Sequence, residues 1–102
     1  MRKYDFESTL SPRLKAQARM AVKKFGTDNQ LKKVLEELAE LQTELSRMGT
    51  DRVDYVKILE EYVDVLMMLE QLYLIVGFKD VIVHMMFAKK LDKQLEILRG
   101  RK

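Results

Sequence analysis

Two pairs of carboxylates in the middle of the chain have the spacing that would let them act together. Glu37 and Glu40 are three residues apart, and so are Glu61 and Asp64. On an α-helix, residues three apart lie on the same face, so each pair presents two carboxylates to one side. Oxygen ligands of this kind suit the hard cations Mg²⁺ and Mn²⁺, which keep positions free for water and phosphate. The spacing is therefore compatible with a metal ion held between two helices.

Four helices are expected to position these carboxylates. The few proline and glycine residues fall where helix boundaries are expected, as Ser11-Pro12 at a helix start and Gly26 at a helix end illustrate. Thr27 and Gln30 have the spacing of a capping box at the next helix start. No segment alternates as a strand with turn residues beside it, so the expected fold class is all-α. The predicted helices cover residues 12–25, 28–48, 52–76 and 80–99.

The second and third helices are predicted to form an antiparallel hairpin. Gly49 is expected to close the second helix, and Thr50 or Asp51 to open the third. Residues whose numbers add up to 101 then stand at similar heights, because each residue advances its helix by ~1.5 Å.

Both carboxylate pairings across this hairpin, residue 37 with 64 and residue 40 with 61, meet that condition. If the two faces turn toward each other, four negative charges converge and repel one another unless a cation neutralises them. The alternative is an ordinary charged face in contact with solvent, which is common on amphipathic helices. From the residues alone both interpretations stay open.

The third helix is apolar on two nearly opposite faces, which one short chain can hardly cover. A helix that is apolar all round has to be buried all round. We therefore expect a second copy of the chain to cover it, most simply across a two-fold axis, in a homodimer or a homotetramer. The two faces are Leu59, Tyr62, Val63, Leu66, Leu69 and Tyr73 on one side and Met68, Leu72 and Ile75 on the other.

Length and composition limit the remaining choices. The 102 residues fit a single domain, residues 1–102, and the chain has no cysteine and one histidine, so thiolate and multi-histidine metal sites within one chain are excluded. The lack of cysteine favours a cytoplasmic location. The apolar run 63–76 is too short and too charged to span a membrane. The net charge is +3, with basic residues scattered over three helices, so nucleic acid is not the expected partner.

The acidic strings Glu36-Glu37-Leu38-Ala39-Glu40 and Glu61-Tyr62-Val63-Asp64 also carry a resemblance. In this order they resemble the EExxE…ExxD signature of the MazG-like nucleotide pyrophosphohydrolases, in the all-α NTP pyrophosphatase superfamily, and the short phage-type members in particular. The resemblance covers roughly residues 26–96. It implies a four-helix MazG-like bundle completed by oligomerisation, and Mg²⁺-dependent hydrolysis of a (deoxy)nucleoside triphosphate to the monophosphate and pyrophosphate.

The same resemblance implies roles for individual residues. Mg²⁺, or Mn²⁺ in its place, would be held by Glu37, Glu40, Glu61 and Asp64. Glu36 and Glu37 are the expected catalytic residues, with Glu36 orienting or deprotonating the attacking water.

Residues outside the acidic strings are expected to contact the nucleotide. Lys90 and Lys93 would contact phosphate, although Asp92 stands where similar sequences have asparagine, and a plain solvated helix face is the alternative for these lysines. Gln30 would contact the base, unless it serves only as the capping-box partner of Thr27. The alternative to an enzyme is a non-catalytic helical oligomer with the same fold that acts through interaction or regulation.

Overall fold

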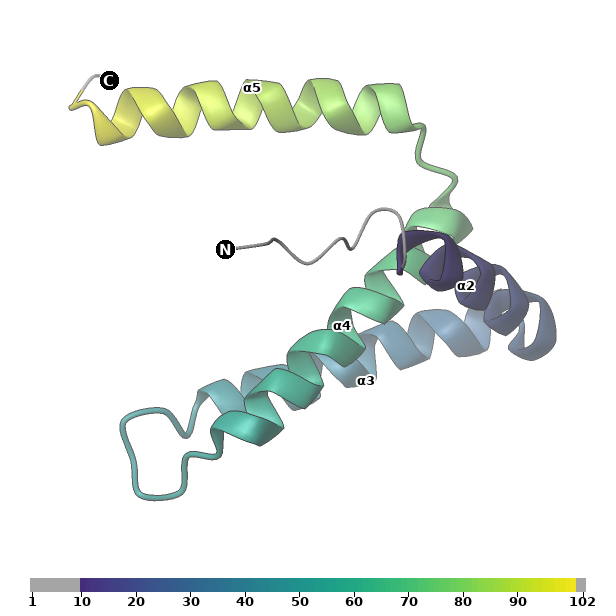
Figure 1. The fold of residues 1–102 in the computed structure, drawn as a ribbon, viewed down its shortest axis with the longest axis horizontal. Helices are drawn as coiled ribbons and strands as arrows, with labels where there is room; N and C mark the ends of the chain where they lie inside the picture. The colour runs from purple at the N-terminus through teal and green to yellow at the C-terminus, as the bar shows by residue number, and fades with distance from the viewer. Residues whose placement is uncertain (1–9, 101–102) are drawn as a thin grey trace.

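Four α-helices make up the part of the chain that the computed structural model describes, residues 10–100 (Figure 1). No strand occurs in this range, so the predicted all-α fold class is confirmed. The predicted domain, residues 1–102, extends past the described residues at both ends. The helices are α2 (Ser11–Phe25), α3 (Thr27–Leu45), α4 (Tyr55–Val76) and α5 (Asp80–Leu98).

The boundary between α2 and α3 lies where the sequence predicts it, but the predicted capping box is wrong. Gly26 separates the two helices with a φ of 88°, a value that glycine adopts without strain. Thr27 is the first residue of α3, and no side chain caps that helix. The side chain of Gln30 is instead buried and bonded to another helix. A buried amide needs a partner more than a solvated helix end does, which explains the difference.

The turn between α3 and α4 is longer than predicted. α3 ends at Leu45 instead of about residue 48, and the chain tightens there through a bond from the Arg47 N–H to the Glu44 carbonyl. α4 begins at Tyr55 instead of residue 52, because Asp54 is its N-cap. The Asp54 carboxylate accepts a hydrogen bond of 3.0 Å from the Lys57 N–H and so satisfies a free amide of the first turn.

α3 and α4 form the predicted antiparallel hairpin, and α2 packs across α4 and touches α3 (Figure 1). The Nε2 of Gln30 donates a hydrogen bond of 2.7 Å to the Oε1 of Gln71 across the hairpin. These two residue numbers add up to 101, so the predicted register is confirmed. Within the described part of the chain, the buried apolar core is small and consists of Ala18, Ala21, Val34, Val65 and Met68.

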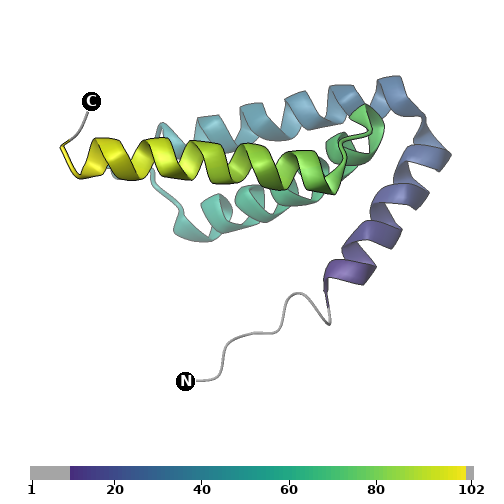
Figure 2. The same cartoon turned by 90° about the horizontal axis from the view of Figure 1, so that it is seen from above.

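α5 does not pack along any of the other three helices, although its first residue, Asp80, accepts a hydrogen bond from the Tyr73 hydroxyl of α4. It turns back after Gly77 and runs above the hairpin, separated from it in Figure 1 and overlying it in Figure 2. The radius of gyration is accordingly 16.8 Å, against about 13 Å for a compact domain of 100 residues. Among the described residues, the predicted apolar face of α4 is open as well, with Leu59 60% and Tyr62 52% exposed.

In the range 10–100, no helix has both the length and the apolar character that a membrane crossing requires.

Candidate metal centre

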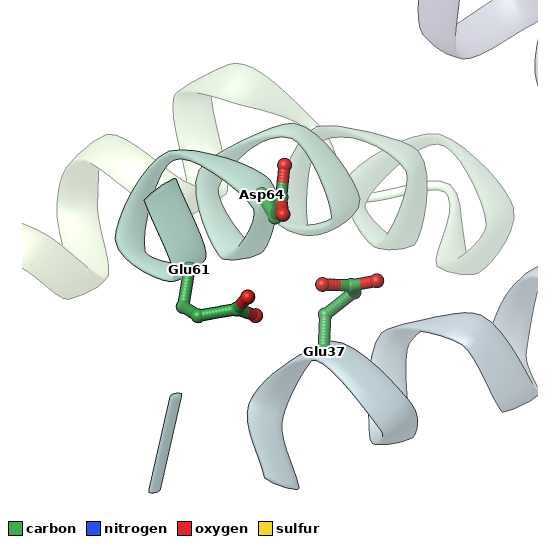
Figure 3. A group of neighbouring side chains, drawn as sticks. All are labelled: Glu37, Glu61 and Asp64. Carbon is green, nitrogen blue, oxygen red and sulfur yellow. The ribbon is translucent and has the colours of Figure 1, made fainter. Parts of the chain in front are cut away.

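Three carboxylates from the two hairpin helices meet at one point (Figure 3). Glu37 comes from α3, and Glu61 and Asp64 come from α4. One oxygen of each lies within 4.8 Å of an oxygen of the other two. Glu37 and Glu61 are buried, at 7% and 3% exposure, whereas Asp64 is exposed. The hairpin thus shields the cluster from solvent at Glu37 and Glu61, whereas solvent reaches it at Asp64.

The carboxylates meet because α3 turns a mixed polar face toward α4. Its buried residues are Gln30, Val34, Glu37 and Glu44, at spacings of three, four and seven that keep them on one side of the helix. The predicted apolar stripe on this helix is therefore only partly buried. Val34 belongs to the core, but Leu38 and Leu45 are 41% and 44% exposed. The remaining members of that stripe are Leu31 and Leu41, which are half-buried, and Met48, which is exposed.

In each buried glutamate of the cluster, one of the two carboxylate oxygens is paired with a lysine on the same helix. The Nζ of Lys33 lies 3.5 Å from Oε1 of Glu37, and the Nζ of Lys57 lies 3.2 Å from Oε1 of Glu61. In both glutamates the other oxygen, Oε2, is buried without a hydrogen-bond partner among the described residues. An ionised oxygen out of contact with water and without a partner is costly. A cation held by these two carboxylates would reduce that cost.

Glu40, the fourth predicted ligand, lies beside this group and is exposed. The pKa of Glu40 is raised, first by a hydrogen bond to Glu61 and then by the negative charges of Glu37 and Glu61. A carboxyl group whose pKa rises in this way is in a negative field that a cation would relieve. Glu40 therefore lies within the electrostatic field of the cluster. A different side-chain rotamer would be needed for it to join the other three carboxylates as a ligand.

A third buried carboxylate, Glu44, was not predicted. It is 7% exposed, and its Oε2 accepts a hydrogen bond of 3.0 Å from Arg47. Its Oε1 is buried without a partner in residues 10–100. Glu44 lines a hollow of about 340 Å³ together with Glu40, Lys57 and Glu61, next to the carboxylate cluster.

The other predicted site residues lie apart from the cluster. Glu36 is on α3, exposed and outside the group of three carboxylates. Lys90 and Lys93 are exposed on α5, which does not pack along α3 or α4. Gln30 is on the same face of α3 as Glu37, but its amide is bonded to Gln71. The structure thus brings together three of the predicted residues and leaves these four outside the group.

The sequence did contain signals for the residues that were missed. Lys33 and Lys57 each stand four residues before a glutamate of the cluster, which is the spacing of an ion pair on one helix. Glu44 and Lys57 have numbers that add up to 101, so the predicted hairpin register already placed them at the same height. Residue 57 is a lysine, so the same register also predicts a pair of opposite charges across the hairpin.

The donors of this cluster fit a hard divalent cation. All are carboxylate oxygens, which is the ligand type that Mg²⁺ and Mn²⁺ prefer. Glu37 and Glu61 each also have one oxygen, Oε2, that is buried without a partner in the described chain. The arrangement could therefore hold a metal ion at the wall of an open hollow, where a second ligand has room to approach. No protein family model, curated protein or solved structure matches this chain.

Proposed function

We propose that the chain is a cytoplasmic, divalent-metal-dependent nucleotide pyrophosphohydrolase that cleaves (deoxy)nucleoside triphosphates to the monophosphate and pyrophosphate. The observation that carries this proposal is the convergence of Glu37, Glu61 and Asp64 with two unpartnered buried oxygens. The nucleotide substrate itself is taken from the resemblance of the two acidic strings to the MazG-like enzymes. The preferred metal is Mg²⁺, with Mn²⁺ as a substitute.

Different residues of the hairpin would have different roles in such a site. Glu37, Glu61 and Asp64 hold the metal, and Glu40 joins them from the edge. A metal held there would polarise a phosphate group and neutralise the charge that develops during cleavage. Glu36, exposed one residue before Glu37, is free to orient or accept a proton from an attacking water.

Lys33 and Lys57 are the hairpin's best candidates for contact with phosphate. Both ammonium groups are within 3.5 Å of a cluster glutamate, and their side chains are 53% and 48% exposed. A metal on those glutamates would compete with both lysines and leave their charges available to an incoming polyphosphate. The predicted phosphate contacts, Lys90 and Lys93, sit on α5 and would need another copy of the chain to bring them to the cluster.

Self-association belongs to the same proposal, as a homodimer or homotetramer. The open apolar face of α4 and the unpacked α5 give the surface that a second copy would cover. The residues of that surface on α5 include Val81, Ile82, Met85, Met86 and Leu91, all at least half exposed. Assembly would bury this surface, which exceeds what monomeric proteins usually leave in water.

The test is a substrate panel. Purified protein is incubated with each NTP and dNTP and Mg²⁺, and pyrophosphate release is measured. We expect release with at least one nucleotide, and its loss in Glu37→Gln and Asp64→Asn, which keep the side-chain size and remove the charge. Release of orthophosphate in place of pyrophosphate would contradict the proposed bond.

The second candidate function is a non-catalytic helical oligomer with a role in interaction or regulation. The extent of exposed apolar surface favours it, because that surface requires a partner whether or not the carboxylates work. A folded, oligomeric protein that shows no turnover of any nucleotide and no stabilisation by Mg²⁺ or Mn²⁺ would favour this second function.

A further inference from the structure

Glu44 has an unusual combination of burial, pairing and position. Only 9% of its side chain is exposed, and Arg47 pairs with its Oε2 at 3.0 Å. Its Oε1 is buried without a hydrogen-bond partner among residues 10–100. The hollow that Glu44 lines also contains Lys57 and Glu61. Glu44, which has one oxygen without a partner among the described residues, thus borders the same hollow as Lys57.

The register of the hairpin places Glu44 opposite Lys57. The hydrogen bond between Gln30 and Gln71 fixes that register, in which residues 44 and 57 stand at equal height on α3 and α4. The ammonium group of Lys57 forms an ion pair with Glu61 at 3.2 Å. The pKa of Lys57 is raised mainly by this bond and by the charge of Glu61, and to a smaller degree by Glu60 and Glu44. Glu44 is therefore the buried carboxylate that faces Lys57 from the other helix.

We propose that Glu44 is a positioning residue that receives the ammonium group of Lys57 when a divalent cation binds Glu61. This inference rests on the metal site of the proposed function. A cation on Glu61 repels the ammonium beside it, and Lys57 has a flexible stem with half of its side chain exposed, so it can move. The carboxylate of Glu44, which borders the same hollow, gives it an acceptor. Lys57 then stays at the wall of the site, turned toward an incoming anion, instead of leaving for solvent.

The exchange predicts an energetic coupling among the metal, Lys57 and Glu44. Without the Glu44 charge, Lys57 keeps its place on Glu61 and competes with the metal. Without Lys57 no ammonium group has to move from Glu61 to Glu44, so removal of the Glu44 charge should change the metal affinity little. Lys33 is the matched control, because it pairs with Glu37 in the same i, i+4 manner on the other helix.

The test is a double-mutant cycle on Mn²⁺ affinity, measured by electron paramagnetic resonance of free Mn²⁺. We expect Glu44→Gln to weaken binding about three- to tenfold in the wild-type background. In a Lys57→Met background, which itself binds more tightly, the same change should alter affinity by less than about twofold. In a Lys33→Met background it should keep its full effect. Equal losses in all three backgrounds would show that Glu44 acts on the ion directly and would overturn the proposal, as would no loss in any.

A second measurement covers the case in which Glu44→Gln fails to fold. In the wild-type protein labelled at lysine, nuclear Overhauser contacts between the Lys57 and Glu44 side chains should strengthen when Mg²⁺ saturates the site. Unchanged contacts at saturation would overturn the exchange. Wild-type protein that binds no Mn²⁺ or Mg²⁺ would overturn the metal site of the proposed function and the exchange with it, whereas metal binding without coupling overturns the exchange alone.

Discussion

The side-chain amides of Gln30 and Gln71 are joined by a buried hydrogen bond of 2.7 Å between α3 and α4. Gln30 is 8% exposed and Gln71 is 2% exposed, so neither amide has water as a ready substitute. The bond lies two turns from Glu37 on the same face of α3. It therefore fixes both the height and the rotation of the two helices that carry the carboxylate cluster.

Replacing one partner of this bond should destabilise the fold. Gln30→Leu leaves the Gln71 amide buried and unpaired, which costs about 1–3 kcal/mol in unfolding free energy by urea denaturation. The double variant with Gln71→Leu should recover much of that loss, since no polar group is then stranded. A double variant as unstable as the sum of its parts would contradict the pairing. Gln30→Leu also tests the predicted base contact, through the ratio of kcat/KM values across nucleotides.

Removal of a cluster charge should abolish stabilisation by metal. A ligand at 100 times its Kd stabilises the folded state by about 2.7 kcal/mol, so Mn²⁺ should raise the Tm of the wild-type protein measurably. Glu37→Gln and Asp64→Asn should lose this rise. Glu60→Gln, an exposed neighbour of Glu61 on the same helix, is the control and should keep it. Glu36→Gln should keep the rise and lose turnover, which would separate its role from metal binding.

The metal-free protein should become more stable as Glu40 is neutralised. The folded-state pKa of Glu40 lies above its usual value because of Glu61 and Glu37. A carboxyl group with a raised folded pKa favours folding below its unfolded pKa, and this contribution is lost as the pH rises through the folded pKa. At neutral pH Glu40→Gln should therefore raise the Tm without metal and lessen the rise that Mn²⁺ produces. A lower Tm in metal-free Glu40→Gln would contradict this sign.

Lys57 on the hairpin and the two lysines of α5, Lys90 and Lys93, should differ in their effect on catalysis. Lys57→Met should tighten metal binding in the absence of nucleotide, because the competing ammonium is gone, yet lower kcat/KM about 10-fold or more through loss of a charge-assisted phosphate contact. Lys90→Met and Lys93→Met should match this loss only if α5 of another copy completes the site. If kcat/KM is unchanged in all three variants, none of these lysines contacts the phosphate.

The open face of α4 should hold the subunits together. Leu66→Glu places a charge in the middle of that face, where Leu66 is 42% exposed in the single chain. We expect light scattering to show a mass near one chain, 12.1 kDa, for this variant and a multiple of it for the wild type. Gln42→Glu, on the exposed side of α3, should leave the mass unchanged. A folded wild-type monomer at micromolar concentration would contradict the assembly.

The sequence predicted the hairpin register well because that register depends only on where the turn is centred. The turn itself is longer at both ends than expected, yet α3 loses three residues and α4 loses three, so its centre does not move. The rotation of the helices could not be predicted in the same way. Leucines at helical spacing indicated one buried stripe on α3, whereas Gln30, Glu37 and Glu44 are buried instead.

The reason is that apolar periodicity alone does not distinguish a core within the chain from a contact between chains. Leu38 and Leu45 fit the pattern equally well for either role. The role of Gln30 was missed for a related reason. Its partner Gln71 lies 41 residues away, and a local motif with Thr27 was the nearer explanation.

The small core of the single chain has a consequence for how the protein behaves in a cell. With five buried apolar side chains among residues 10–100, a single chain would gain little from folding alone, and if the proposed assembly forms, its folded population would depend on encounters with other copies. Dilution would then unfold the chain and expose it to proteases. The amount of active protein would rise more steeply than its rate of synthesis, so expression would act as a threshold for activity.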